Sequence, residues 1–268
     1  MPRTKVCLAG ATGWAGSALA RAAARQDDME LVAAVSRTHA GKPLGAALDE
    51  PGIAAPVYAS AQAALAAHPC DVFVEYTDPS VAKANVLAAL AAGAHVVVGT
   101  SGLTDDDYAD LDAAARQAGR GVLAAGNFAL TVVLLLKFAE AAAKLIPHWE
   151  VIDYAHAGKP DAPSGTAREL AARLGAVNQA WHEVPVEETV GERAARGATL
   201  GGAQVHSVRL PGFRLSAEVI FGLPDQRLSL RADAGSSAEP YVDGALLAIR
   251  RVHTLVGVHR GLDAVLEL

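Results

Sequence analysis

The sequence contains few of the residues that build disulfide frameworks or metal sites. Its 268 residues include two cysteines, Cys7 and Cys70, which lie far apart in the chain. A disulfide scaffold and a zinc site made of clustered cysteines are therefore excluded, and buried reduced thiols of a cytoplasmic protein explain both residues. The nine histidines are scattered without metal-ligand spacing, so no metal is predicted.

Positive charge and long apolar runs are also scarce. The chain has 23 Lys and Arg against 29 Asp and Glu, a net charge of −6, which argues against a broad nucleic-acid surface. The most apolar run, 129–136, stops at Lys137, far short of the ~18 residues that span a bilayer. The N-terminus opens like a signal peptide, but glycines interrupt its apolar stretch. We expect a cytoplasmic protein that binds neither nucleic acid nor membrane.

Several catalytic motifs are missing as well. The sequence has no H-E-x-x-H, no G-x-S-x-G and no glycine-rich loop ending in Gly-Lys-Ser/Thr. These absences argue against zinc peptidases, serine hydrolases of the nucleophile-elbow type and P-loop nucleotide hydrolases.

Strand and helix signals alternate through the first half of the chain. Short apolar runs that end near glycines alternate with Ala-rich helical segments, which predicts an α/β fold with a doubly wound parallel sheet. The predicted strands are 5–9, 30–35, 57–58, 71–75, 95–98 and 121–125. The predicted helices are 17–25, 81–92 and a segment that ends at 118 and begins with a capping box at Thr104.

The pattern changes after Asn127. The predicted elements are a long apolar helix to about residue 145, a strand over 149–156, a polar loop over 157–163 and a helix from about Ser164 to Gly175. After a loop-rich segment, three runs alternate as antiparallel strands do, namely 204–210, 215–221 and 227–232, before a final helix over about 242–256. This pattern predicts a second, α+β domain with a mostly antiparallel sheet.

A glycine motif lies at the first strand-to-helix junction and fits G-x-x-G-x-x-G. The glycines allow a tight turn close to a pyrophosphate, and the following helix supplies free N–H groups. The motif predicts a dinucleotide site, with a plain tight turn as the alternative. The candidate residues are Gly10, Ala11, Thr12, Gly13, Trp14, Ala15 and Gly16.

The end of the second strand bears on the cofactor. NAD-selective folds place an acid there for the ribose 2′-hydroxyl, whereas this chain has Ser36 and Arg37. Arg37 can pair with a 2′-phosphate. The pattern favours NADPH, with NADH left open and an ordinary solvated arginine as the alternative.

Three further strand ends belong to the same predicted crevice, because open parallel sheets bind ligands beyond the carboxyl ends of their strands. Glycines there let a nicotinamide or ribose lie close to the backbone. We expect cofactor contacts from Tyr76, Thr77, Gly99, Thr100, Ser101, Gly126, Asn127 and Phe128.

The segment from His156 to Ala167 joins a strand end, a loop with two prolines and a helix start. Ser164 or Thr166 can cap that helix, and the free N–H groups around Gly165 and Thr166 suit a carboxylate. Lys159 can pair with a carboxylate or donate a proton, and His156 is a second donor. The alternative is a capped surface helix with solvated Lys and His.

These motifs together resemble the 4-hydroxy-tetrahydrodipicolinate reductase family, also called dihydrodipicolinate reductase, over nearly the whole chain. The most specific element is Lys159 with Asp161-Ala-Pro-Ser-Gly-Thr-Ala167; the glycine motif, Gly99-Thr-Ser-Gly102, Asn127-Phe128 and the strand-like run 205–212 also match. The resemblance implies hydride transfer from NAD(P)H to a cyclic unsaturated dicarboxylate in lysine and diaminopimelate biosynthesis.

The resemblance also implies an organisation and site roles. It implies a homotetramer, with a dinucleotide-binding domain over 1–127 to which 238–268 return, and a substrate-binding and oligomerisation domain over 128–237. Lys159 matches the catalytic lysine, and His156 matches a substrate-contacting histidine. Ser164, Gly165 and Thr166 match the substrate-carboxylate site.

The sequence departs from the family where the substrate binds. Ala155 replaces the histidine usually assigned as proton donor, and 235–239 contain no arginine. One interpretation is that the proton comes from His156, Tyr154, Lys159 or a water. The other is that the substrate is a different imino or keto acid. Another alternative is a non-catalytic nucleotide-binding protein.

Overall fold

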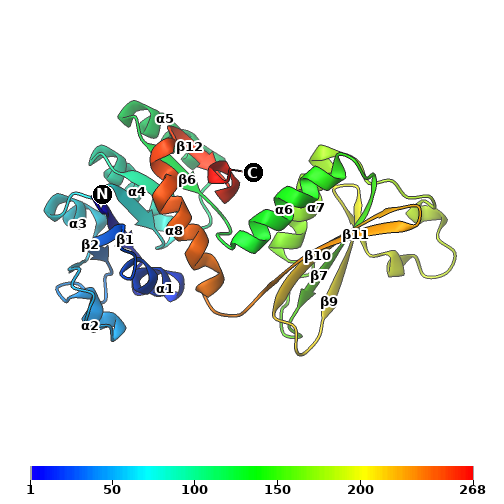
Figure 1. Cartoon of the computed structure of the whole chain (residues 1–268), viewed down its shortest axis with the longest axis horizontal. Helices are drawn as coiled ribbons and strands as arrows, with labels where there is room; N and C mark the ends of the chain where they lie inside the picture. The colour runs from blue at the N-terminus through cyan, green and yellow to red at the C-terminus, as the bar shows by residue number, and fades with distance from the viewer. Residues whose placement is uncertain (1, 268) are drawn as a thin grey trace. The chain divides into compact units, whose positions relative to one another are not determined.

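Two units, each with its own β-sheet, make up the chain. The computed structural model describes residues 2–267. Unit 1 comprises Met1–Ala129 and Ala238–Leu268, and unit 2 comprises Leu130–Ser237. Figure 1 labels their helices and strands. Within residues 2–267, no helix is long and apolar enough to cross a membrane.

Unit 1 contains a parallel sheet in the order β12-β6-β5-β4-β1-β2-β3. Its strands are β1 (Thr4–Ala9), β2 (Met29–Val35), β3 (Val57–Tyr58), β4 (Val72–Glu75), β5 (His95–Val98), β6 (Gly121–Ala124) and β12 (Gly257–Arg260). The chain runs outward from β1 in both directions, so the strand order reverses between β1 and β4. The carboxyl ends of these two strands therefore form the crevice where such sheets bind ligands.

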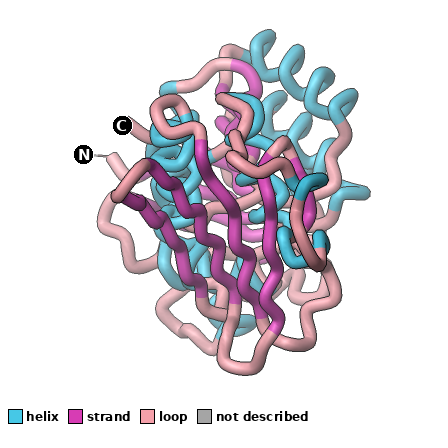
Figure 2. Tube along the Cα trace, turned by 90° about the vertical axis from the view of Figure 1, so that its right-hand side faces the viewer, coloured by secondary structure: helices cyan, strands magenta, loops and turns pink. Residues whose placement is uncertain are grey.

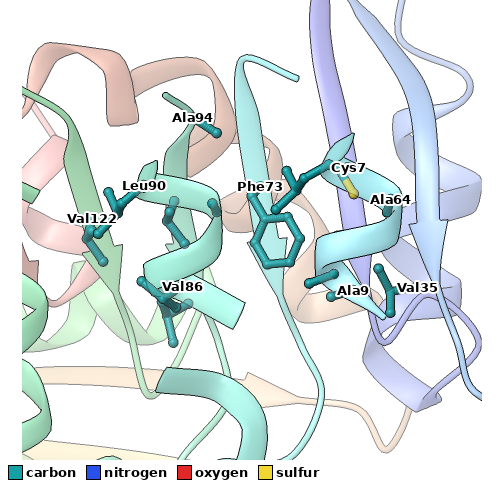
Figure 3. Close-up of a cluster of buried hydrophobic side chains, with 14 of the residues drawn as sticks. Cys7, Ala9, Val35, Ala64, Phe73, Val86, Leu90, Ala94 and Val122 are labelled. Atoms are coloured by element: carbon teal, nitrogen blue, oxygen red, sulfur yellow. The ribbon is translucent and has the colours of Figure 1, made fainter. Parts of the chain in front are cut away.

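Helices cover both faces of this sheet. They are α1 (Trp14–Ala23), α2 (Leu44–Leu48), α3 (Ala61–Ala67), α4 (Pro79–Ala91), α5 (Asp105–Ala118) and α8 (Val242–Arg251). Side chains of α3, α4 and α5 share one buried cluster with the strands. The ring of Phe73 lies in the middle of this cluster, with Cys7 on one side and Val86 on the other (Figure 3). Burial of an aliphatic or aromatic side chain of this kind contributes about 1.5–3 kcal/mol.

The predicted parallel α/β fold is confirmed. It differs from the prediction in three short elements that were not predicted, α2, α3 and β12, and in the ends of two helices. The predicted capping box of α5 is present between Thr104 and Asp107. Helix α1 begins at Trp14, earlier than predicted, because Gly13 is already its N-cap. Helix α8 ends at Arg251, short of the predicted end, because the chain tightens into a 3-10 turn over Val252–Thr254 before β12 begins at Gly257.

Unit 2 contains a sheet in the order β11-β10-β7-β9-β8, seen with its strands side by side in Figure 2. Its elements are α6 (Leu130–Ala143), β7 (His148–Ala155), α7 (Gly165–Val177), β8 (Ala198–Leu200), β9 (Ala203–Arg209), β10 (Leu215–Leu223) and β11 (Gln226–Ala234). Short 3-10 turns, Val186–Glu188 and Arg193–Arg196, lie between α7 and β8.

The sheet of unit 2 is mostly antiparallel, as predicted, with one exception. Strand β9 alternates like an antiparallel strand, but it pairs in parallel with β7. The reason is its connection, because α7 and the segment after it form a long crossover between β7 and β9, and parallel neighbours need such a crossover. Alternation of side chains reports burial of one face and not strand direction.

The two cysteines are free thiols. Cys7 is buried in β1, as predicted, whereas Cys70 is only half-buried and lies in the turn before β4. The adjacent Cys70 thiol raises the pKa of Cys7, and burial raises it further. Cys7 is therefore protonated at neutral pH.

Candidate active site

The glycine loop packs against the end of β4. Gly10 has a φ of +79°, and a Cβ at this position would lie 2.1 Å from the Tyr76 carbonyl oxygen. A Cβ at Gly16 would lie 2.1 Å from the Gly10 carbonyl oxygen. Helix α1 starts directly behind the loop, and no side chain caps its first N–H groups. The loop thus presents free donors at a helix N-terminus, an arrangement that binds phosphates.

Glu75 fixes the turn after β4. Its carboxylate is fully buried and accepts hydrogen bonds from the Thr77 N–H over 2.8 Å and from the Thr77 hydroxyl. The amide of Asn85 donates to Oε2 over 2.9 Å, and the Thr100 hydroxyl donates to Oε1 over 3.3 Å. A buried carboxylate is tolerated only when it is satisfied in this way. The network ties the ends of β4 and β5 to each other.

A cavity of about 350 Å³ opens at the carboxyl ends of these strands. Two ring pairs form part of its wall, Tyr76 with Phe128 at 5.9 Å and Trp14 with Tyr241 at 5.8 Å between ring centroids. The Tyr76 hydroxyl is buried and has no hydrogen-bond partner among the described residues. Burial raises the pKa of Tyr76, so this hydroxyl is a neutral donor that a polar ligand group can satisfy.

Many of the predicted cofactor residues meet in this cavity. Its lining includes Trp14, Ala15, Tyr76, Thr77, Gly99, Thr100, Ser101, Gly126 and Phe128. A Cβ at Gly126 would meet no atom within 4 Å, so the backbone there is open to a ligand. Pro79, Ala125 and Tyr241 also line the cavity, and none of them was predicted as a site residue. Tyr241 carries no local signal, because it lies on the segment that returns to unit 1 from the far end of the chain.

The remaining predicted cofactor residues lie outside the lining of the cavity. Gly10, Ala11, Thr12, Gly13 and Gly16 form the glycine loop, and Ser36 and Arg37 follow β2. Asn127 uses its side-chain oxygen to accept the Ala129 N–H over 2.8 Å. Its amide nitrogen is the group left to contact a ligand.

Hydroxyl groups gather at the end of β2. The Ser36 hydroxyl lies 2.8 Å from that of Thr12 in the glycine loop and 3.3 Å from that of Thr38. The Thr38 hydroxyl lies 2.9 Å from His39 Nδ1. Arg37 is exposed beside them. The Ser80 hydrogen bonds lower the pKa of the Asp78 carboxyl after β4, and the charge of Arg37 lowers it further by a smaller amount. The donor set suits a phosphate better than a ribose diol, which an acid would bind.

In unit 2, Lys159 lies on the loop 156–164 that follows β7. Its Nζ lies 2.7 Å from Asp161 Oδ1, and the Lys159 side chain is 21% exposed. The hydrogen bond from Lys159 holds the pKa of Asp161 below its usual range. His156 is exposed, and its carbonyl accepts the Lys159 N–H over 3.1 Å. The ammonium of Lys159 is thus oriented and partly open to solvent.

Helix α7 begins directly after this loop. Ser164 is the N-cap and its hydroxyl accepts the Ala167 N–H over 3.3 Å; Thr166 lies inside the first turn. The first N–H groups of a helix have no partner within it, so those of Gly165 and Thr166 are available. A Cβ at Gly165 would meet nothing within 4 Å. This helix end can accept an anion such as a carboxylate.

The side chains of β7 alternate between two faces of the sheet. Asp153 and Ala155 are buried, at 1% and 0% exposure. Tyr154 faces the other way and donates to Glu218 Oε2 over 3.0 Å, with the Arg231 guanidinium 4.6 Å from its ring centroid. This orientation leaves His156, Lys159 and water as proton donors for a ligand near α7. Within residues 2–267, no group of three or more His, Cys, Asp or Glu side chains is arranged to hold a metal ion.

Family models match both parts of the chain. The model described as dihydrodipicolinate reductase, N-terminus, matches residues 4–128. The model described as dihydrodipicolinate reductase, C-terminus, matches residues 131–266.

Curated relatives match along their full length. The 4-hydroxy-tetrahydrodipicolinate reductase of Halalkalibacterium halodurans is 37% identical over 263 residues, which cover 98% of this chain and 99% of that one. The enzyme of the same name from Desulfitobacterium hafniense is 35% identical over 268 residues, which cover 100% of both chains.

Solved structures are similar to this chain as well. A dipicolinate-bound dihydrodipicolinate reductase from Paenisporosarcina matches with a TM-score of 0.88 and 29% identity, covering 98% of this chain and 100% of that one. An amine dehydrogenase from Mycobacterium smegmatis matches with a TM-score of 0.69 at 14% identity, over 99% of this chain and 96% of that one. The second likeness shows the fold alone.

Proposed function

The chain belongs to the dihydrodipicolinate reductase family and is an NAD(P)H-dependent oxidoreductase, and on that premise we propose which residues carry its reaction. The reaction is reduction of 4-hydroxy-tetrahydrodipicolinate to tetrahydrodipicolinate in lysine and diaminopimelate biosynthesis, in which a hydride and a proton are added and the 4-hydroxyl group leaves as water. The observation that carries the proposal is that one chain combines the glycine loop and cavity of unit 1 with the Lys159 loop and free α7 N-terminus of unit 2.

The residues of unit 1 fit a nicotinamide dinucleotide. The glycine loop and the N-terminus of α1 bind the pyrophosphate. The cavity beside Gly126 and the unpartnered Tyr76 hydroxyl take the nicotinamide end, and the Asn127 amide nitrogen contacts its carboxamide. The bound cofactor supplies the hydride. Arg37 and the hydroxyls of Ser36 and Thr12 bind the 2′-phosphate, so NADPH is the preferred donor.

The residues of unit 2 hold the dicarboxylate and deliver the proton. One substrate carboxylate accepts the N–H groups of Gly165 and Thr166 at the start of α7. The Ser164 hydroxyl keeps that turn in shape as its N-cap. Lys159 donates the proton from an ammonium that Asp161 orients at 2.7 Å, and His156 contacts the substrate.

The protein acts in the cytoplasm as a homotetramer. The free thiols of Cys7 and Cys70 support a reducing compartment. Ile152 and Ile220 lie half-exposed on the outer face of the unit 2 sheet, which supports that face as the contact between copies. Light scattering tests the tetramer, and a monomer would contradict it.

A steady-state assay tests the activity and the role of Lys159. Freshly generated 4-hydroxy-tetrahydrodipicolinate is added to protein and NADPH, or NADH, and loss of reduced cofactor is followed. We expect turnover in the usual range of about 1–10³ s⁻¹. Lys159→Ala removes the general acid and lowers kcat about 10²–10⁴-fold. Absence of turnover by wild-type protein that still binds NADPH would contradict the substrate assignment.

Ala155 favours a second candidate, a reductase of another imino or keto acid. The methyl group at this position is fully buried and transfers no proton, and Tyr154 is bound to Glu218 on the opposite face. A substrate that receives its proton from His156, Lys159 or water, and not from this position, fits such a site. Turnover of other imino and keto acids in the same assay, exceeding that of the dicarboxylate, distinguishes the two candidates.

A further inference from the structure

A buried ion pair lies beneath the loop that carries Lys159. Arg209 Nη2 donates to Asp153 Oδ2 over 2.6 Å, and the two side chains are 16% and 2% exposed. Asp153 lies on β7 and Arg209 at the end of β9, its parallel neighbour. The pair therefore spans the one parallel pairing of the unit 2 sheet.

The same two side chains bind both halves of the loop 156–164. Asp153 Oδ2 also accepts the backbone N–H of Ser164 over 2.8 Å. Arg209 Nη2 also donates to the Asp161 carbonyl oxygen over 2.7 Å. Asp161 is the residue whose carboxylate holds Lys159, and Ser164 is the N-cap of α7. A continuous set of contacts thus joins the pair to both proposed substrate groups.

Charge stabilises this arrangement. Burial alone raises the pKa of Asp153, but the hydrogen bonds from Arg209 and from Ser164 outweigh it and hold the pKa below its usual value. The carboxylate is therefore ionised at neutral pH and accepts three donors, the third being the Ser207 hydroxyl at 3.3 Å. The planar guanidinium bridges a carboxylate and a carbonyl at once, which a lysine ammonium does less well.

We infer that Arg209, together with Asp153, is a positioning residue for the reaction. The pair binds the Asp161 carbonyl and the Ser164 N–H and holds these two groups at fixed positions. It thereby fixes the distance between the Lys159 ammonium and the carboxylate site at the start of α7. Neither side chain contacts the substrate in this assignment. The inference rests on the proposed function for its kinetic consequence and on geometry alone for its effect on the loop.

Arg209→Lys tests the inference, since it keeps the charge and loses the bridge. A misplacement of about 1 Å costs about 10²-fold in rate, so we expect kcat/KM for the dicarboxylate to fall about 10–100-fold. The KM for NADPH is expected to stay unchanged, because its site lies in unit 1. Amide hydrogen exchange at Ser164, measured in the free protein, is expected to accelerate.

Arg173→Lys is the matched control. Arg173 Nε donates to Glu140 Oε1 over 2.5 Å with a side chain 24% exposed, and it lies on α7 away from the loop. We expect it to leave the kinetics and the Ser164 exchange unchanged. Asp153→Asn is the second test variant and is used if Arg209→Lys fails to fold. It keeps the shape of the side chain and an oxygen that accepts the Ser164 N–H, and it removes the negative charge.

The outcomes separate this inference from the proposed function. Wild-type kinetics toward the dicarboxylate in a folded Arg209→Lys or Asp153→Asn protein would overturn the inference. A rise in the KM for NADPH as large as the fall in kcat/KM for the dicarboxylate would also overturn it, because it would indicate general destabilisation. If wild-type protein turned over no dicarboxylate, the proposed function would fail, and unchanged Ser164 exchange in the variants would still reject the positioning role.

Discussion

The proposed role of Arg37 is to bind the 2′-phosphate of NADPH, and its removal gives a quantitative prediction. At about 4 Å in water, two unit charges attract by about 1 kcal/mol, and a phosphate carries about −1.5 to −2 charges. Because Arg37 is exposed, the aqueous value applies and the pairing contributes about 1.5–2 kcal/mol. Since 1.4 kcal/mol is a factor of ten, Arg37→Ala is expected to lower kcat/KM for NADPH about 10–30-fold.

The assay compares kcat/KM for NADPH and NADH in parallel. NADH lacks the 2′-phosphate, so its efficiency is expected to change by less than about threefold, and the NADPH defect is expected to shrink at high salt because the pairing is screened. Arg3→Ala is the matched control, because it removes the same charge just before the amino end of β1. Equal losses for both cofactors would refute the assignment of Arg37 to the 2′-phosphate.

Three other predictions follow from the described contacts. Gly10→Ala places a Cβ 2.1 Å from the Tyr76 carbonyl oxygen at a φ of +79°. We therefore expect a lower melting temperature and loss of NADPH binding in a titration. An unchanged titration would contradict the close packing of the loop. Asp153 has a lowered folded-state pKa, so its stabilisation is present above its unfolded value of about 3.9 and is lost as the pH falls through the folded value. Asp153→Asn is expected to cost about 3–5 kcal/mol at pH 7 and to flatten the acid limb of urea denaturation; an unchanged limb would show that Asp153 is not ion-paired. Trp14 is 62% exposed at the cavity wall, so we expect NADPH to quench its fluorescence and Trp14→Phe to abolish most of that quenching; full quenching in the variant would place the cofactor elsewhere.

Local patterns were enough to predict the strands of the parallel sheet. The apolar residues of the runs 5–9, 71–75 and 95–98 are buried with few exceptions, so composition alone marks these strands. The strands and α-helices that the sequence did not predict, α2, α3, β8 and β12, span 3 to 7 residues. Elements this short give too few turns or alternations for a periodic signal.

Features that depend on distant residues were beyond prediction. Asp153 and Arg209 are 56 positions apart, and only the parallel pairing of β7 with β9 brings them together. Both Ser164 and Thr166 fit a capping pattern, and the Asp153 carboxylate that binds the Ser164 N–H helps to fix Ser164 as the cap. Tyr154 remained open as a proton donor because the sequence alone does not show which face of the sheet a strand residue occupies.

Transfer of a labelled hydride tests the central claim most directly. Wild-type protein is supplied with 4-hydroxy-tetrahydrodipicolinate and NADPH that carries deuterium at its transferable position, and the product is analysed by mass spectrometry. The account predicts tetrahydrodipicolinate that carries the deuterium, formed at a rate that Lys159→Ala strongly reduces. Oxidised cofactor with unlabelled product, or no product with the cofactor bound, would contradict it.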